Sequence, residues 1–113
     1  MKQMTKDDVI TWLETYNKKH NTDNITIHCN SNGTVIDVSI DGDFDCNGSE
    51  LTEFPFQFKS VSGYFDCHNC PITSLEGAPQ SIRGSFDCSH NKQLTSLKGA
   101  PQSVSGSFYC SGC

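Results

Sequence analysis

The sequence predicts a mainly β fold with an N-terminal α-helix, in which a short solenoid of about four 21-residue coils makes up most of the chain. Four segments align without gaps: SIDGDFDC (39–46), SVSGYFDC (60–67), SIRGSFDC (81–88) and SVSGSFYC (103–110). Their cysteines are 21, 21 and 22 residues apart. Between them PITSLEGAPQ (71–80) matches QLTSLKGAPQ (93–102), and ELTEFPFQFK (50–59) is a looser copy. The first 34 residues do not follow this repeat.

Each repeat is expected to open with one β-strand. Side chains alternate between the two faces of a strand, so one face of SVSGYFDC carries Val61, Gly63, Phe65 and Cys67. The opposite face carries Ser62, Tyr64, Asp66 and His68. Because every copy places an apolar residue, Gly, Phe and Cys on the first face, that face is predicted to be the core. The later LTSL segments add apolar contacts, and GAP then redirects the chain.

The first part of the chain is predicted to be a cap. Thr5 and Asp8 have the spacing of a helix N-cap and its third residue, and they precede an apolar stripe with helical period. That stripe comprises Val9, Leu13 and Tyr16, with Ile10 and Trp12 beside them. ITIHC and TVIDVSI then flank Asn30–Gly33, which predicts a hairpin. We therefore expect residues 1–34 to cover the open end of a solenoid formed by 35–113, in one compact domain.

The repeat resembles the leucine-rich repeat, whose pattern is LxxLxLxx(N/C)xL. Phe65, Cys67, Cys70 and Ile72 fall at its positions, and Phe86, Cys88, Asn91 and Leu94 follow with one inserted residue. Phe and Cys replace the usual leucines, which departs from the family. The wording FDCSxNxLTSLxGAP, over residues 35–113, is most similar to small leucine-rich-repeat-like proteins carried by bacteriophages. This resemblance implies a partner-binding protein, for example an inhibitor of host defence such as an anti-CRISPR protein.

The net charge and the composition reduce the number of possible functions. The net charge of −5 argues against direct binding of nucleic acid, which requires clustered Lys and Arg, and favours a protein partner with a basic surface. The start of the chain has no apolar signal region and no segment is long enough to span a membrane, so the host cytoplasm is the expected location. In that compartment the seven cysteines are expected to be thiols.

The outward strand face is the candidate interaction site. Equivalent residues of stacked coils lie about 4.8 Å apart, so Asp45, Asp66 and Asp87 should form a carboxylate ladder that continues into Tyr109. An acidic face of this kind could bind a basic partner, or could simply be a solvated face that keeps the protein soluble. The predicted partner-binding residues are Asp41, Asp43, Asp45, Tyr64, Asp66, Asp87 and Tyr109.

The cysteines allow a structural and a metal-binding interpretation. Cys46, Cys67, Cys88 and Cys110 are predicted to be small buried core residues, with Cys70 and Cys113 at the Asn/Cys position of the turn and Cys29 in the hairpin. No cofactor is expected on this interpretation. The alternative is zinc, since Cys67–Cys70 and Cys110–Cys113 are CxxC pairs. If zinc is present, the candidate ligands are Cys67, Cys70, Cys88, Cys110 and Cys113.

Catalysis is not predicted, because the chain contains no Walker, GxSxG, HExxH or dinucleotide-binding motif. The sequence stops at Cys113 within a unit, so the coil at Phe108 is expected to expose apolar surface. That surface could join two copies into a homodimer. The alternative functions are therefore a phage structural or scaffold component that associates through this coil, and a zinc-stabilised interaction module.

Overall fold

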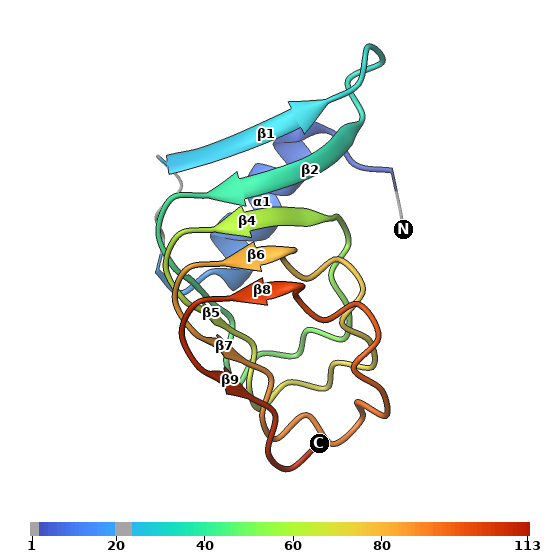
Figure 1. Cartoon of the computed structure of the whole chain (residues 1–113). Helices are drawn as coiled ribbons and strands as arrows, with labels where there is room; N and C mark the ends of the chain where they lie inside the picture. Colours follow the sequence, from blue (N-terminus) through green and yellow to red (C-terminus); the bar gives the residue numbers. More distant parts are fainter. Residues whose placement is uncertain (1–2, 20–23) are drawn as a thin grey trace.

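The computed structural model describes residues 3–19 and 24–113 and contains a short β-solenoid with one helix at its N-terminal end (Figure 1). The helix α1 spans Lys6–Tyr16. Five strands form one sheet in the order β1-β2-β4-β6-β8: Ile25–Cys29, Val35–Ile40, Phe58–Val61, Ser81–Ile82 and Ser103–Val104. Four form a second sheet in the order β3-β5-β7-β9: Phe44–Asp45, Phe65–Asp66, Phe86–Asp87 and Phe108–Tyr109. The predicted fold class is confirmed.

Helix α1 begins as the sequence predicts. The Thr5 side chain accepts a hydrogen bond from the Asp8 N–H, and the Asp8 carboxylate accepts one from the Thr5 N–H, which completes a capping box. Val9 and Leu13 are fully buried, and Trp12 and Tyr16 pack against the same core. An 11-residue helix is marginal by itself in water, so this packing supplies most of its stability.

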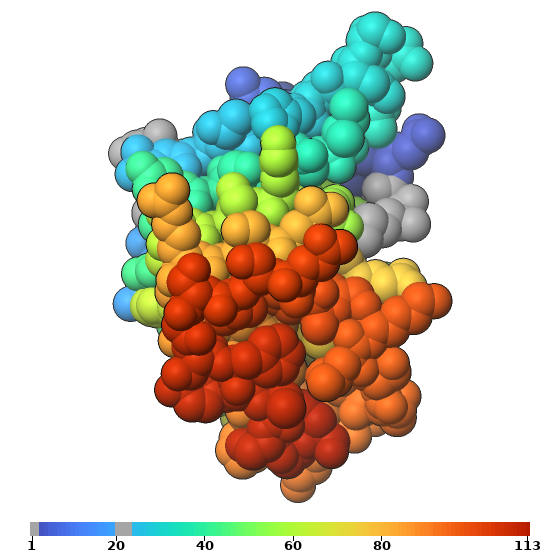
Figure 2. All heavy atoms as spheres, in the orientation of Figure 1, coloured from blue at the N-terminus to red at the C-terminus, as the bar shows by residue number. Residues whose placement is uncertain are grey.

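The predicted hairpin is also present, as the antiparallel pair β1 and β2. Gly33 in its turn has a φ of +80°, a conformation that favours glycine, and Asn30 Oδ1 accepts hydrogen bonds from the N–H groups of Asn32 and Thr34. Strand β2 pairs with β4 in parallel on its other side. The hairpin therefore continues directly into the solenoid sheet, and the coils follow one another along the molecule in sequence order (Figures 1 and 2).

The expectation of one strand per repeat is wrong, because each repeat forms two short strands in different sheets. In the coil at 60–67, β4 ends at Val61 and β5 begins at Phe65, with a bend between them. Gly63 lies at this corner, and a Cβ there would be 1.8 Å from the Asp43 Oδ1 and 2.8 Å from the Gly42 carbonyl oxygen. Residues 62–64 thus form a corner where stacked backbones approach closely. Val61 and Phe65 both point inward, but from separate sheets.

The core is built from the repeated apolar positions. Phe44, Phe65 and Phe86 are fully buried and stack in neighbouring coils, with ring centroids 4.7 and 5.7 Å apart. Cys46, Cys67 and Cys88 are also fully buried, as predicted. Cys110 was predicted to be a core residue, but it is exposed. In the described chain a neighbouring coil covers Cys110 on its Cys88 side only, and a core position needs cover on both sides.

The N-terminal cap closes one end of this core. The Trp12 ring stacks on Phe44 at 5.7 Å and meets Phe56 edge-on at 5.1 Å. Asn17, which is buried, accepts a hydrogen bond from the Asp45 N–H, and the Lys18 N–H donates to the Asp45 carbonyl. These bonds satisfy backbone groups of β3, the edge strand of the four-stranded sheet. Within the described residues, no helix is long and apolar enough to cross a membrane.

Candidate protein-binding face and metal-ligand group

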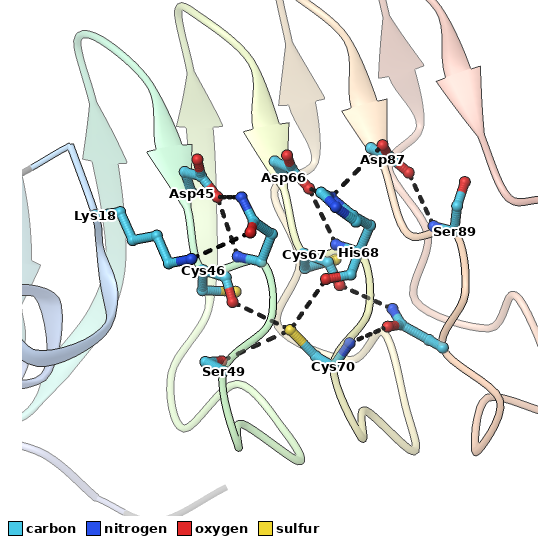
Figure 3. Close-up of polar contacts among 12 residues, drawn as sticks. Lys18, Asp45, Cys46, Ser49, Asp66, Cys67, His68, Cys70, Asp87 and Ser89 are labelled. Atoms are coloured by element: carbon cyan, nitrogen blue, oxygen red, sulfur yellow. Dashed lines mark hydrogen bonds and ion pairs between the residues drawn. The ribbon is translucent and has the colours of Figure 1, made fainter.

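The carboxylate ladder lies on the four-stranded sheet. Parallel pairing places Asp45 opposite Asp66, Asp66 opposite Asp87, and Asp87 opposite Tyr109. The inward neighbours of these residues are Phe and Cys, so alternation directs the carboxylates to the outer face (Figure 3). The ladder that the repeat predicts is therefore present in register. We call Asp45, Asp66 and Asp87 the acidic ladder.

Each carboxylate of the acidic ladder also has a structural task. The Oδ1 atom accepts a hydrogen bond from the N–H group two residues later: Asn47 at 3.0 Å, His68 at 3.0 Å and Ser89 at 2.9 Å. This is an Asx turn, in which the side chain replaces a backbone acceptor where the strand ends. One oxygen of each carboxylate therefore holds the turn. The repeat of Asp at this position has a local explanation that sequence reasoning did not consider.

The two other predicted acidic residues lie nearer the corner. The Asp41 Oδ1 accepts a hydrogen bond from the Ser62 hydroxyl at 2.7 Å. The Asp43 Oδ1 accepts one from the Tyr64 N–H at 2.9 Å. Both bonds join neighbouring coils. The equivalent bend of the preceding coil, at 41–42, thus separates Asp41 from the acidic ladder, so the predicted outward row is not one straight strand face.

The two predicted tyrosine anchors have different surroundings. Tyr109 is half exposed and extends the line of the acidic ladder. Tyr64 is partly buried, and the Lys19 ammonium lies 5.4 Å from the centre of its ring. At the same edge the Lys18 ammonium donates a hydrogen bond to the Asn47 side chain at 3.1 Å. Sequence reasoning did not include these lysines, which follow the helix and reach the face only because α1 packs across the end of the solenoid.

Comparison of the chain with protein-family models, with curated protein sequences and with solved structures finds no match.

His68 adds an imidazole nitrogen, a second kind of metal-ligand atom, to the carboxylate oxygens of the acidic ladder. Its Nδ1 lies 2.5 Å from Asp66 Oδ1 and 3.9 Å from Asp87 Oδ2, so the ring lies between the two carboxylates (Figure 3). The hydrogen bond to Asp66, together with the charges of Asp66, Asp87 and Asp45, raises the pKa of His68, although burial acts in the opposite direction. Asp66, His68 and Asp87 form a group that can hold a metal ion, with ligand atoms within 4.8 Å of one another.

No cysteine of the predicted zinc set belongs to this group. Burial raises the pKa of Cys67 and raises that of Cys88 to about 12, so both remain thiols at neutral pH. The Cys113 thiol donates to the Cys88 carbonyl at 3.0 Å, and the Cys70 thiol donates to the Cys46 carbonyl at 3.1 Å. Cys70 and Cys113 thus occupy the turn position that the sequence predicts for them.

Hydrogen bonding and burial shift the pKa of the Cys70 thiol in opposite directions. Hydrogen bonds from the Cys46 thiol and the Ser49 hydroxyl lower the pKa of Cys70, while burial raises it. The Cys70 Sγ also lies 3.1 Å and 3.5 Å from the carbonyl oxygens of Cys46 and His68. Carbonyl oxygens accept only from a protonated thiol, so the thiol is the form that fits this geometry.

Asn91 repeats the role of Cys70 one coil further along the chain. Its Nδ2 donates to the Cys67 carbonyl at 2.9 Å, and its Oδ1 accepts from the Cys70 N–H at 2.7 Å. The side chain is completely buried. Cys70, Asn91 and Cys113 therefore form a structural series, in which a polar side chain satisfies the carbonyl of the core cysteine in the preceding coil.

The five-stranded sheet has a chemically different outer face. Its pairing aligns a row of hydroxyl groups from Thr26, Ser39, Ser60, Ser81 and Ser103. The Ser60 hydroxyl donates to the Ser39 hydroxyl at 3.1 Å. The acidic side chains that sequence reasoning selected belong to the other sheet or to the corner. The five-stranded sheet also carries the charged residues Asp37 and Lys59, but none of the carboxylates of the acidic ladder.

Proposed function

We propose that the chain is a protein-binding module that uses the acidic ladder to occupy a basic surface on its partner. The observation that carries this proposal is the in-register alignment of Asp45, Asp66 and Asp87 on adjacent parallel strands. Like charges in directly opposed positions repel one another. A partner rich in Lys and Arg relieves this repulsion on binding, and complementary charge steers the two proteins together.

The proposed partner is a protein whose own ligand is an anion. Nucleic-acid-binding enzymes expose basic grooves, and a ladder of carboxylates is chemically suited to occupy them. Together with the resemblance to small bacteriophage proteins, this extends the proposal to inhibition of a host effector such as a CRISPR nuclease. The mechanism is steric and electrostatic competition with the nucleic acid. The acidic ladder would be the contact region and Tyr109 an adjoining aromatic contact.

The test replaces Asp45, Asp66 and Asp87 together with Asn. Asn keeps the side-chain oxygen that accepts the turn hydrogen bond, so the charge is removed while the Asx turns remain. The matched control replaces Glu50, Glu53 and Glu76, which are exposed and lie off the ladder, with Gln. Both variants lose three carboxylates. Only the choice of surface therefore differs between them.

Wild-type protein and both variants are immobilised, and the proteins they capture from a cell extract are identified. The affinity of the captured protein is then measured in EDTA at low and high salt. We expect the Asp variant to bind at least about tenfold more weakly, the Glu variant to bind like wild type, and wild-type affinity to fall with salt. Nucleic acid should compete for the captured protein. Equal affinity of wild type and the Asp variant would refute the proposal.

A second candidate function is association through the coil at Phe108. Leu97, Phe108 and Tyr109 are exposed large apolar side chains, with 48%, 38% and 51% of their surface accessible. If Phe108→Ser abolishes capture or self-association while the Asp variant does not, a structural or scaffold role through this coil replaces the proposed one. Light scattering measures the self-association. A zinc-stabilised module, the remaining alternative, predicts that a chelator lowers the melting temperature.

A further inference from the structure

The acidic ladder differs between coils at one position. The residue two places after the ladder Asp is Asn47, His68 or Ser89 in successive coils. Only the middle coil therefore adds an imidazole to the carboxylates. Within residues 3–19 and 24–113, Asp66, His68 and Asp87 are the one group of three His, Cys, Asp or Glu residues whose ligand atoms lie within 4.8 Å of one another.

The backbone holds the two carboxylates in place, and Asp66 in turn contacts the imidazole of His68. Asp66 and Asp87 are directly paired in the parallel register of β5 and β7. The N–H groups of His68 and Ser89 fix the two Oδ1 atoms at 3.0 and 2.9 Å. Asp87 Oδ2, by contrast, faces the imidazole at 3.9 Å. Binding of a cation here would require little new ordering, because the carboxylates are already positioned.

The site is also accessible to an ion from solution. The side chains of Asp66, Asp87 and His68 are 19%, 31% and 35% exposed, so each is partly buried and still in contact with solvent. Figure 3 shows the imidazole between the two carboxylates, on the outer side of the sheet. An ion at this point would complete its coordination with water. It would neutralise the repulsion between the two paired carboxylates, which a neutral imidazole does not do.

We propose that Asp66, His68 and Asp87 bind a divalent transition-metal ion such as Zn²⁺ or Ni²⁺. One imidazole nitrogen with two carboxylate oxygens is a donor set that suits these ions, whereas Mg²⁺ and Ca²⁺ prefer oxygen ligands alone. The ion takes the place of the proton between His68 Nδ1 and Asp66 Oδ1, and that proton is released to solvent. The site does not depend on the proposed partner.

The test measures the affinity of the metal-free protein for Ni²⁺ by calorimetry, with Mg²⁺ as the comparison ion. His68→Asn gives the middle coil the residue that the preceding coil carries as Asn47, and Asp87→Asn keeps the turn acceptor. The control is His28→Asn, because His28 forms a separate pair with Asp37 on the hairpin at 2.6 Å. We expect both site variants to bind Ni²⁺ at least about tenfold more weakly, and the control to bind like wild type.

Two spectroscopic measurements locate the ion. Paramagnetic Ni²⁺ should broaden the amide NMR signals of residues 66–68 and 87–89 before others. Co²⁺ should bind without a thiolate-to-metal charge-transfer absorption, because no cysteine belongs to the group. Unchanged affinity in His68→Asn and Asp87→Asn, a thiolate absorption band, or broadening centred on the hairpin would overturn the proposal. So would the absence of measurable Ni²⁺ binding by the wild type.

Discussion

The cysteines show how the role of a single residue depends on its surroundings. Three of them, Cys46, Cys67 and Cys88, are fully buried and act as small apolar side chains of the core. Cys70, also buried, uses its thiol as a hydrogen-bond donor to a carbonyl. Cys29, Cys110 and Cys113 are exposed. Because thiol chemistry requires both access and a thiolate, the seven cysteines should divide into two reactivity classes.

We expect only Cys29, Cys110 and Cys113 to react quickly with iodoacetamide at pH 8. The pKa of Cys88, about 12 because of burial, lies far above this pH, so it carries almost no thiolate. Raising the pH toward 9 should therefore not add Cys67 or Cys88 to the modified set. Peptide mass spectrometry identifies the modified sites, and unfolding in guanidinium should expose all seven. Rapid native modification of Cys67 or Cys88 would contradict their burial.

The repeated element is a coil whose corner depends on glycine. Gly42, Gly63, Gly84 and Gly106 stack on one another, and the N–H of each of the last three donates to the carbonyl of the glycine before it in the stack, at 2.8 to 2.9 Å. A Cβ on Gly84 would be 2.7 Å from the carbonyl carbon and oxygen of Gly63. Those atoms are backbone and cannot move aside as a flexible side chain can. The ladder of hydrogen bonds therefore continues around the corner only while this position has no side chain.

Gly84→Ala should destabilise the protein by about 1–3 kcal/mol, because the added methyl group forces two stacked backbones apart. The neighbouring Arg83→Ala is the control, since Arg83 is exposed and should change stability by less than about 0.5 kcal/mol. Chemical denaturation followed by circular dichroism measures both. A Gly84→Ala protein as stable as Arg83→Ala would show that the coils do not stack as closely as described.

At the scale of the whole molecule, the cap and the solenoid share one core. The contiguous cluster of buried residues runs from Val9 and Leu13 in α1 to Leu94 in the last full turn. The cap also closes the edge of β3 through Asn17 and Lys18. The acidic ladder therefore begins at a strand whose open edge is covered by the helix end. Loss of the cap should therefore lower the stability of the whole chain and not of the helix alone.

Leu13→Ala tests this dependence. Removal of a completely buried leucine typically costs about 2–5 kcal/mol, so global stability should fall by that amount. Trp12 fluorescence reports the cap and far-ultraviolet circular dichroism reports the sheets, and their unfolding curves should coincide in wild type and variant. Thr11→Ala, at an exposed position of the same helix, is the control. Separate transitions for the two signals would show that the cap and the solenoid unfold independently.

The sequence alone determined the solenoid class, the helix start at Thr5, the hairpin and the register of the acidic ladder. These features depend on local periodicity or on exact repetition, and both can be read along the chain. The corner at Gly63 was not predicted, because Val61 and Phe65 fit the alternation of a single strand equally well. Only the stacking of neighbouring coils distinguishes a bend from a continuous strand.

Tertiary structure alone decided which side chains meet at the candidate sites. His68 follows Asp66 by two residues in the sequence, but its approach to Asp87 depends on the parallel pairing of β5 with β7. Lys19 reaches Tyr64 only because α1 crosses the end of the solenoid. The burial of a cysteine likewise depends on cover from both neighbouring coils, which Cys88 has and Cys110 lacks in the described chain. Periodicity specifies the face on which a residue lies, whereas contacts between distant segments specify its neighbours.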